Sequence, residues 1–140
     1  MIKQIAVFLE NKEGRASACC KVLKDAGVNL LALSIADTKE FGILRMITDD
    51  NEKALSVLQG AGFLSSMVEL VGLEVPDQSG ALSDLLIELG EAKINVEYMY
   101  GLSVGGEEAS IVVKTSDVDK ADEVFTKYNI ETLSDSDLNV

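Results

Sequence analysis

The sequence contains no histidine, and its only thiols are the adjacent Cys19 and Cys20. Without histidine, the usual imidazole bases and the zinc sites built from cysteine and histidine are excluded. Neighbouring residues of a helix point about 100° apart, and the pair lacks the Cys-x-x-Cys spacing of a redox site. We therefore interpret both cysteines as small core side chains and expect neither a metal ion nor a cofactor.

Basic residues are also few: 12 Lys and Arg stand against 24 Asp and Glu, which gives a net charge of −12. This charge repels nucleic-acid phosphates and anionic lipids, so neither is an expected partner. The sequence has no run of about 20 apolar residues and no signal-peptide cleavage pattern. Apolar residues still make up 47% of the chain, enough for a packed core, so we expect a globular cytoplasmic protein.

The two halves of the sequence repeat each other at an offset of 66 residues, which indicates an internal duplication. Each half has Asn or Asp, two further residues, Gly, a segment of helical length and then Asn. The aligned pairs are Asn11 and Asp77, Gly14 and Gly80, and Asn29 and Asn95. The offset becomes 67 in the later part of each copy, which places one extra residue near Gly105 and Gly106.

The hydrophobic periodicity changes in the same order in both copies. Alternation over 5–9 predicts a half-buried strand, helical spacing over 16–26 predicts a helix, and 71–75 and 82–92 repeat this pair. The first copy continues with strands over 28–36 and 43–48, a helix over 51–58 and a strand over 64–68. The order βαββαβ, twice, predicts an α+β fold of two ferredoxin-like repeats packed side by side, with antiparallel sheets and helices on one face.

The segments NKEGRASACCKVLKDAGVN, residues 11–29, and DQSGALSDLLIELGEAKIN, residues 77–95, resemble the loop and first helix of ACT domains. These are small ligand-sensing modules of amino-acid metabolism. INVEYMYGL, residues 94–102, resembles the corresponding strand of bacterial proteins that consist of two ACT modules. Many ACT loops have Pro before the Gly, whereas this chain has Glu13 and Ser79, so its loops are expected to be less rigid.

The resemblance implies two ACT modules, residues 1–68 and 69–140, and a non-enzymatic regulator that binds a free amino acid where the modules meet. Gly lets the backbone approach a ligand closely, and the first-turn N–H groups of a helix lack intrahelical partners, so they can bind a carboxylate. The implied sites pair Asn11 with Asn95 and Asp77 with Asn29. The candidate ligand-binding residues are Asn11, Lys12, Glu13, Gly14, Arg15, Asn29, Asp77, Gln78, Ser79, Gly80, Asn95, Tyr98 and Tyr100.

The asparagines and Asp77 also have purely structural interpretations. Asn11 and Asp77 can cap the helix that follows or make an Asx turn. Asn29 and Asn95 can end the preceding helix or order the entry to the strand. The sequence leaves both interpretations open.

The tyrosines and Arg15 have alternatives as well. Tyr98 and Tyr100 lie on one face of their strand, where they line a pocket or fill an interface. If they line a pocket, the ligand has an aromatic or planar side chain. Arg15 either neutralises a carboxylate or remains solvated.

Two further functions compete with amino-acid sensing. One is a ligand-free interaction subunit that regulates a metabolic enzyme. The other is a small hydrolase that uses Arg15 and a nearby Asn, although the sequence shows no nucleophile with a base and no phosphate loop with Lys. Apolar residues on the sheet face away from the helices predict a homodimer that covers them. These residues include Phe8, Leu31, Leu33 and Met99.

Overall fold

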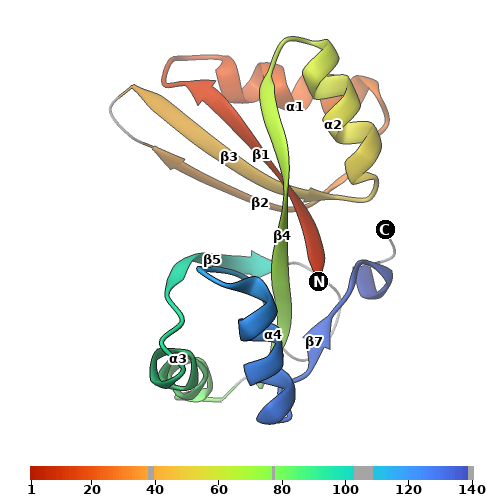
Figure 1. The fold of residues 1–140 in the computed structure, drawn as a ribbon. Coiled ribbons are helices and arrows are strands. Elements are labelled where there is room, and N and C mark those ends of the chain that lie inside the picture. The colour runs from red at the N-terminus through yellow and green to blue at the C-terminus, as the bar shows by residue number, and fades with distance from the viewer. Residues whose placement is uncertain (38–39, 77, 103–108, 139–140) are drawn as a thin grey trace. The chain divides into compact units, whose positions relative to one another are not determined.

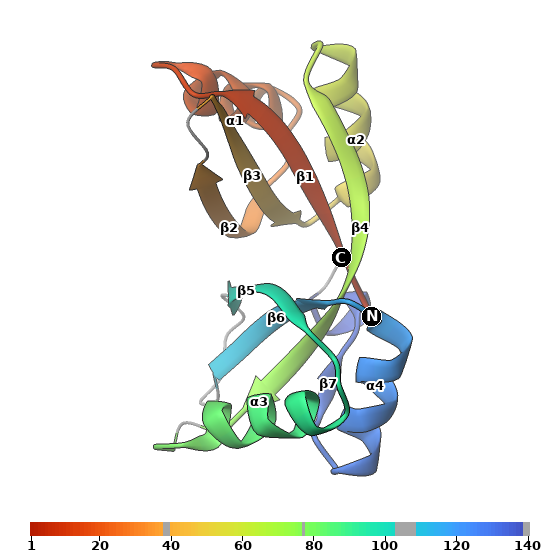
Figure 2. The ribbon, with the colours of Figure 1, turned by 60° about the vertical axis from the view of Figure 1, so that its left-hand side comes forward.

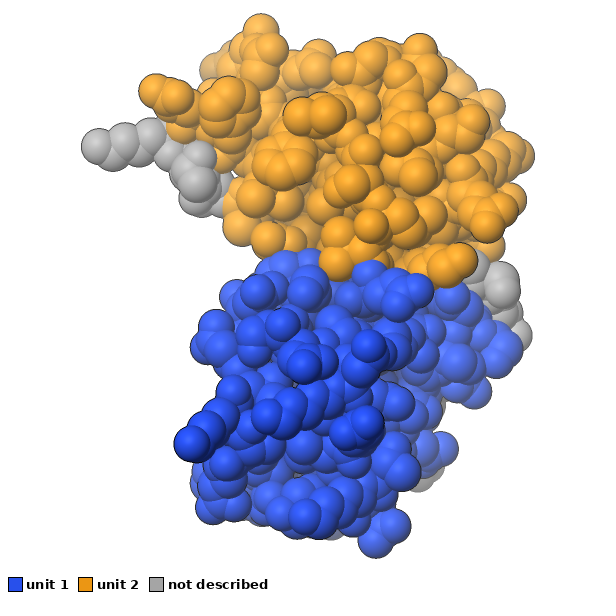
Figure 3. Space-filling model, in the orientation of Figure 1, with its two compact units in different colours: residues 1–2, 69–138 blue, residues 3–68, 139–140 orange. Residues whose placement is uncertain are grey.

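The computed structural model describes residues 1–37, 40–76, 78–102 and 109–138. These residues form two compact units, coloured separately in Figure 3: the N-terminal unit, Lys3–Val68, and the C-terminal unit, Met1–Ile2 with Glu69–Leu138. Asp77 and the extra residue expected near Gly105 and Gly106 lie outside the described residues. None of the helices in the described ranges is long and apolar enough to cross a membrane.

The N-terminal unit has the predicted βαββαβ order (Figure 1). Its elements are β1 (Ile2–Glu10), α1 (Arg15–Asp25), β2 (Leu30–Asp37), β3 (Phe41–Thr48), α2 (Asn51–Gly60) and the first part of β4 (Leu64–Val75). The strands lie in the order β2-β3-β1-β4, with β3 antiparallel to both β1 and β2. Both helices lie on one face of this sheet, as expected (Figure 2).

The core of the N-terminal unit lies between this sheet face and the helices. Ile5, Val7 and Leu9 alternate along β1 and are buried against Cys19 and Leu23 of α1. Burying a side chain of this size typically stabilises the fold by about 1.5–3 kcal/mol. The interpretation of the cysteines as core residues is confirmed for Cys19, which is fully buried, whereas Cys20 is half-buried.

The C-terminal unit repeats this order. Its elements are the second part of β4, α3 (Ala81–Glu91), β5 (Val96–Leu102), β6 (Ala109–Thr115), α4 (Val118–Lys127) and β7 (Thr132–Leu133), followed by the 3-10 helix η1 (Asp135–Leu138). The strand order is β7-β4-β6-β5. The core again lies between helices and sheet, where Leu85 and Leu89 of α3 and Phe125 of α4 pack against Val71 and Val113.

The predicted break between strands 64–68 and 71–75 is absent, because β4 runs without interruption from Leu64 to Val75. Glu69 and Leu70 join the two predicted segments, and neither residue is a turn former. Leu70 and Val71 are buried, so an extended backbone across this junction keeps their apolar side chains away from water. One strand therefore serves both units.

The edge strands β2 and β5 each contain a register shift close to their start. The shift lies between Leu30 and Ala32 in β2 and between Val96 and Tyr98 in β5, again 66 residues apart. An extra residue of this kind inverts the alternation of side chains for the rest of a strand. The duplication therefore includes an irregularity that periodicity alone does not reveal.

The bulges overturn part of the predicted apolar face. Leu33 lies opposite Met46 and Met99 lies opposite Val113, and both partners belong to the cores beneath the helices. Because opposite residues of a sheet share a face, Leu33 and Met99 are on the helix side, and their prediction on the other face is wrong. Phe8 is on the face away from the helices, as expected, and is 45% exposed.

Candidate functional site

The helices that follow the two repeated loops begin differently from the other two. Gly14 and Gly80 are the N-cap residues of α1 and α3, with φ of 81° and 88°, and within the described residues neither helix has a side-chain cap. In contrast, α2 and α4 begin at Asp50 and Asp117, whose carboxylates accept hydrogen bonds from the backbone N–H three residues later, at 3.1 and 3.0 Å. The first N–H groups of α1 and α3, those of Arg15 and Ala81, donate to the carbonyls of Lys12 and Gln78 at 3.5 and 3.2 Å. Another acceptor would therefore meet the N–H groups of the next residues in the first turn.

The described residues of the two loops make equivalent backbone hydrogen bonds. The N–H of Lys12 donates to the carbonyl of Glu10 at 2.8 Å, and the N–H of Gln78 donates to the carbonyl of Pro76 at 2.7 Å. The positive φ of the glycine that follows lets the chain turn into the helix, in a backbone region that other residues rarely adopt. Both helices therefore begin after a glycine of the same conformation.

Charged side chains surround the first loop. Lys12 Nζ lies 2.8 Å from a carboxylate oxygen of Glu10. The hydrogen bond and positive charge of Lys12, with a smaller contribution from Arg15, hold the pKa of Glu10 below its usual value. Asn11 donates its backbone N–H to the carbonyl of Glu40 at 3.1 Å, and Glu13 is exposed. At neutral pH, the positive charges of Lys12 and Arg15 thus balance the negative charges of Glu10 and Glu13 around the helix start.

Asn29 and Asn95 are fixed through their backbones at equivalent places. The N–H of Asn29 donates to Oδ1 of Asp49 at 3.0 Å and the N–H of Asp49 returns a bond to the Asn29 carbonyl at 3.0 Å. Asn95 exchanges the same two bonds with Ser116, at 3.1 and 2.9 Å. The residues themselves are exposed. These bonds order the entry to each strand through backbone groups alone, so a role of the asparagine side chains stays a prediction.

The loop and the asparagine of one unit do not meet. Between them lies an entire helix, about 16 Å long in the case of α1 from its 11 residues. Asn29 instead lines a shallow cavity of about 360 Å³ with Cys20 and Lys24, at the C-terminal end of α1. The candidate residues of the N-terminal unit therefore separate into a loop group and a group near Asn29.

Tyr98 and Tyr100 lie on the same face of β5, as the sequence predicts. Their rings are stacked, with centroids 6.5 Å apart and an interplanar angle of 15°. Tyr100 lies opposite Val112, whereas the adjacent Val113 points into the helix-side core. The two half-buried rings are consequently on the sheet face away from α3 and α4, apart from the loop of their own unit.

A cavity of about 210 Å³ lies beside the loop of the N-terminal unit. Its lining includes Arg15, and the remaining lining residues are Phe8, Glu10, Phe41, Gly62, Phe63 and Leu64. The Arg15 guanidinium carbon is 5.0 Å from the Phe63 ring centroid, a cation–π arrangement. Arg15 is therefore the candidate residue that lines the cavity beside the first loop.

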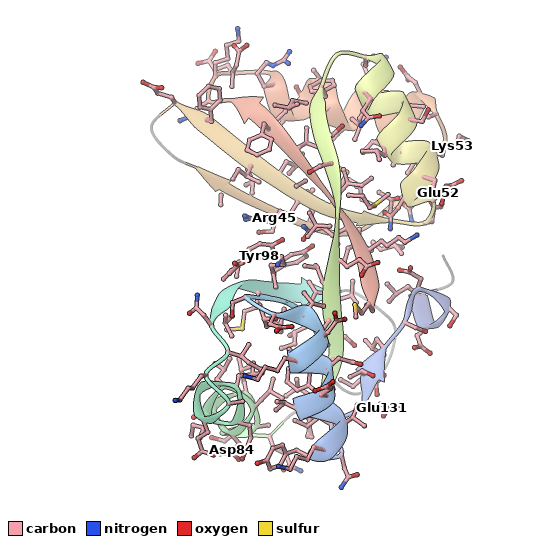
Figure 4. The ribbon with its side chains drawn as sticks, in the orientation of Figure 1. Arg45, Glu52, Lys53, Asp84, Tyr98 and Glu131 are labelled. Carbon is pink, nitrogen blue, oxygen red and sulfur yellow. The ribbon has the colours of Figure 1, made fainter. Side chains whose placement is uncertain are left out.

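The C-terminal unit has a larger cavity, about 390 Å³, at the equivalent place. Gln78 and Ser79 line it, but so do three acidic residues, Glu74, Asp84 and Glu88, together with Tyr128 and apolar side chains. Figure 4 labels Asp84 on α3. A hydrogen bond to Glu88, together with the negative charge of that carboxylate, raises the pKa of the Tyr128 phenol. This cavity has an acidic lining.

Sequence reasoning missed most of the cavity-lining residues. Phe63 and Ile130, which lie in equivalent cavity walls, are 67 residues apart and each follows the turn after a helix. The alignment of the two copies contained this signal, but it did not show that this turn lies beside the loop near residue 14. That proximity depends on β4 and β1 being neighbours in the sheet.

Two ferredoxin-like modules in one chain, each with an uncapped loop–helix opening beside a cavity, define a class of regulatory, ligand-sensing proteins. The family model of the ACT domain pair matches residues 1–140, and the chain belongs to this family. Protein BT0572 from Bacteroides thetaiotaomicron is similar over 99% of this chain and 95% of that chain, with 37% identity and a TM-score of 0.90.

Two more distant structures share the fold. The regulatory subunit of aspartate kinase from Thermus thermophilus, in ligand-free form, is 11% identical over 89% of this chain and 91% of that chain, with a TM-score of 0.63. The corresponding subunit from Thermus flavus is 12% identical over 89% and 90%, with a TM-score of 0.60. The search of curated proteins found no match. These two structures show a shared fold, and the family match is to the ACT domain pair.

Proposed function

We propose that this protein is a non-enzymatic sensor of a free amino acid, which it binds through its repeated loop–helix openings. The observation that carries the proposal is the contrast between the four helices. α2 and α4 are capped by Asp50 and Asp117, whereas α1 and α3 open at Gly14 and Gly80 without a side-chain cap among the described residues. Uncapped N–H groups and the positive end of the helix dipole favour a bound carboxylate.

The expected affinity follows from a small number of charged hydrogen bonds. The helix dipole contributes only about 0.3–1 kcal/mol at an exposed helix start. Hydrogen bonds to the carboxylate and ammonium groups contribute roughly 1.5–3 kcal/mol each, so two or three of them with side-chain burial give about −5 to −8 kcal/mol net. This corresponds to a Kd on the order of 1–100 μM, a range suited to sensing a metabolite pool.

In the proposed arrangement, the modules are residues 1–68 and 69–140, and each site combines a loop from one with a strand entry from the other. Asn11 pairs with Asn95, and Asp77 pairs with Asn29. Asn11 is neutral, whereas Asp77 is anionic and disfavours a carboxylate beside it. The Asn11 site is therefore the one that we propose for the carboxylate.

The output of the sensor is a change in the arrangement of the modules or of a homodimer, because a ligand shifts whichever equilibrium it binds unequally. The proposed partner that reads this change is a metabolic enzyme. The fold shared with regulatory subunits of aspartate kinase is compatible with such a partnership. If the stacked Tyr98 and Tyr100 contact the ligand, they favour one with a planar side chain.

The proposal is tested by a thermal-shift screen of the full chain against the twenty amino acids, followed by calorimetry. One selective stabiliser that loses its effect as the methyl ester supports the sensor. In the variant with Asn11→Ala and Asn95→Ala, the response should disappear while the ligand-free melting temperature changes little. Glu123→Ala, an exposed position on α4, serves as the control. A screen without any stabiliser would instead favour the ligand-free interaction subunit.

A further inference from the structure

We infer that the Arg15 cavity of the N-terminal unit binds apolar carboxylates built on a single aromatic ring, and that an amino group on the ligand is not required. The Arg15 cavity is the space of about 210 Å³ lined by Arg15, Phe8, Phe41, Phe63 and Leu64, with Glu10 and Gly62. This site adjoins the proposed amino-acid site of the first loop, because Arg15 is the first residue of α1, but it differs in using the guanidinium and the aromatic walls in place of asparagine amides.

The apolar part of the cavity is unusually exposed. Phe8, Phe41 and Leu64 are 45%, 51% and 72% exposed, and all three face one small cavity. The sequence has only four phenylalanines, and three of them line this space. Aromatic walls favour a flat apolar ligand, through both burial of its surface and ring–ring contacts. The volume is below the roughly 300–1,000 Å³ of sites for drug-sized ligands, so a one-ring compound fits better than a nucleotide.

The charged part of the cavity selects an anion. The Arg15 guanidinium lies over the Phe63 ring, and its Nε atom is buried without a hydrogen-bond partner among the described residues. A buried donor of this kind has a desolvation cost that a bound acceptor removes. Stacking on Phe63 also holds the planar fork in one orientation, which reduces the entropy lost when a carboxylate binds.

The acidic residue in the cavity does not cancel this preference. Glu10 lines the same space, but its carboxylate is 2.8 Å from Lys12 Nζ. Glu10 is therefore already paired, and Arg15 remains the cation without an opposite charge in hydrogen-bonding contact among the described residues. A ligand ammonium would have to compete with Lys12 for Glu10, which is why an amino group is not part of the inferred ligand.

The duplication allows the Arg15 cavity to be compared with its counterpart in the C-terminal unit. The counterparts of Phe8, Arg15 and Phe63 are Glu74, Ala81 and Ile130, which line the equivalent cavity of the C-terminal unit. That cavity has no arginine in its described lining, and it gains acidic side chains, so it repels a carboxylate. The two copies have diverged at this place, and the inferred site occurs once in the chain.

The experiment titrates the full chain with 3-phenylpropionate and follows saturable shifts of the ligand and protein NMR signals. We expect the acid to bind, whereas its primary amide and 2-phenylethylamine bind at least tenfold more weakly. Arg15→Gln should weaken binding about tenfold or more, since a charge-assisted hydrogen bond is lost. Binding should also weaken as NaCl rises from 50 to 500 mM. The probe has no amino group, so its result is independent of the amino-acid screen.

Matched variants separate a specific site from general apolar adsorption. Phe41→Ala should weaken binding about tenfold, whereas Leu33→Ala, at a residue with the same 51% exposure outside the cavity lining, should not change it. Lys21→Gln, an exposed cation on α1 paired with Asp25, is the control for Arg15→Gln. Absence of binding, equal binding of acid and amide, or unchanged binding in both Arg15→Gln and Phe41→Ala overturns the inference. A second copy of the chain covering the cavity would appear as binding that vanishes with increasing protein concentration, which also overturns it.

Discussion

The hydroxyl of Thr48 donates a hydrogen bond to Oδ1 of Asn51 at 2.8 Å inside the N-terminal unit. The same oxygen accepts the backbone N–H of Thr48 at 3.0 Å, and Nδ2 of Asn51 donates to the carbonyl of Lys3 at 3.0 Å. In the second copy the equivalent residues are Thr115 and Val118. The Thr115 hydroxyl is buried without a hydrogen-bond partner among the described residues.

This difference predicts opposite effects of one substitution at two equivalent positions. Thr48→Val should destabilise the N-terminal unit by about 0.5–1.5 kcal/mol, because Oδ1 of Asn51 loses one of its two donors. Thr115→Val should be neutral or stabilise the C-terminal unit by about 1 kcal/mol, because it removes an unsatisfied hydroxyl at nearly constant volume. Urea unfolding of both variants measures the two changes. A loss of stability in Thr115→Val that matches the loss in Thr48→Val would contradict this account.

A second prediction concerns Gly72 of β4. A Cβ added there would collide with Cδ1 of the fully buried Ile2 and lie 3.2 Å from Cβ of Leu133. Gly72→Ala should therefore cost about 1–3 kcal/mol through overpacking. Ile2→Val, which removes the colliding atom, should cost about 0.5–1.5 kcal/mol alone.

The double variant provides the control for Gly72. If the collision with Ile2 is the cause, the variant with Gly72→Ala and Ile2→Val should be more stable than the sum of the single effects predicts. Equilibrium unfolding of the four proteins in a double-mutant cycle gives the coupling energy. Strict additivity would show that Leu133 or the backbone, and not Ile2, limits the space at Gly72.

The third prediction tests the loop geometry. Gly14 has φ of 81° and an added Cβ would have no neighbour within 4 Å, so substitution costs only backbone strain. Gly14→Ala should destabilise the chain by about 1–2 kcal/mol, and Gly14→Asn by less, because Asn tolerates the left-handed region better. Thermal unfolding ranks the variants. Equal stability of Gly14→Ala and the unsubstituted chain would mean that the loop adopts another conformation in solution.

The fourth prediction is a dependence of stability on pH at the alkaline end. Burial, assisted by the charge of Cys20, raises the pKa of the Cys19 thiol from 9.0 to about 11. Because the folded state retains this proton longer than the unfolded state, the stabilising effect is complete below about pH 9 and is lost as the pH rises towards 11. In Cys19→Ala, the decline in unfolding free energy over this range should be shallower. Identical pH profiles for both proteins would refute the assignment to Cys19.

The strands and helices were predictable because the hydrophobic periodicity and glycine positions that mark them lie within short stretches of sequence. The alternation of Ile5, Val7 and Leu9 marks a strand with one buried face, and the structure places all three in the core. The glycines at positions 14 and 80 marked the helix starts, and the structure confirms them as N-cap residues. Equal spacing in both halves then indicated two similar units.

The predicted sheet faces were wrong where one extra residue in a strand reverses the direction of the side chains that follow it. The bulge near the start of β2 moved Leu33 to the helix side, and the bulge in β5 did the same to Met99. Whether a strand accommodates an extra residue depends on hydrogen bonds to its neighbour, which local hydrophobicity does not report. The continuity of β4 depends in the same way on burial of Leu70 and Val71.

By itself the amino-acid sequence determined the duplication, the order of strands and helices, and the two glycine-opened loops, since each arises from contacts between residues close along the chain. Only the tertiary structure decided which side chains surround those loops. Arg15 and Phe63 are 48 positions apart in sequence, yet the guanidinium lies over the ring, because sheet pairing brings β4 beside β1. Long-range pairing of this kind is a property of the folded sheet, and it places side chains that differ between the two copies around two matching loops.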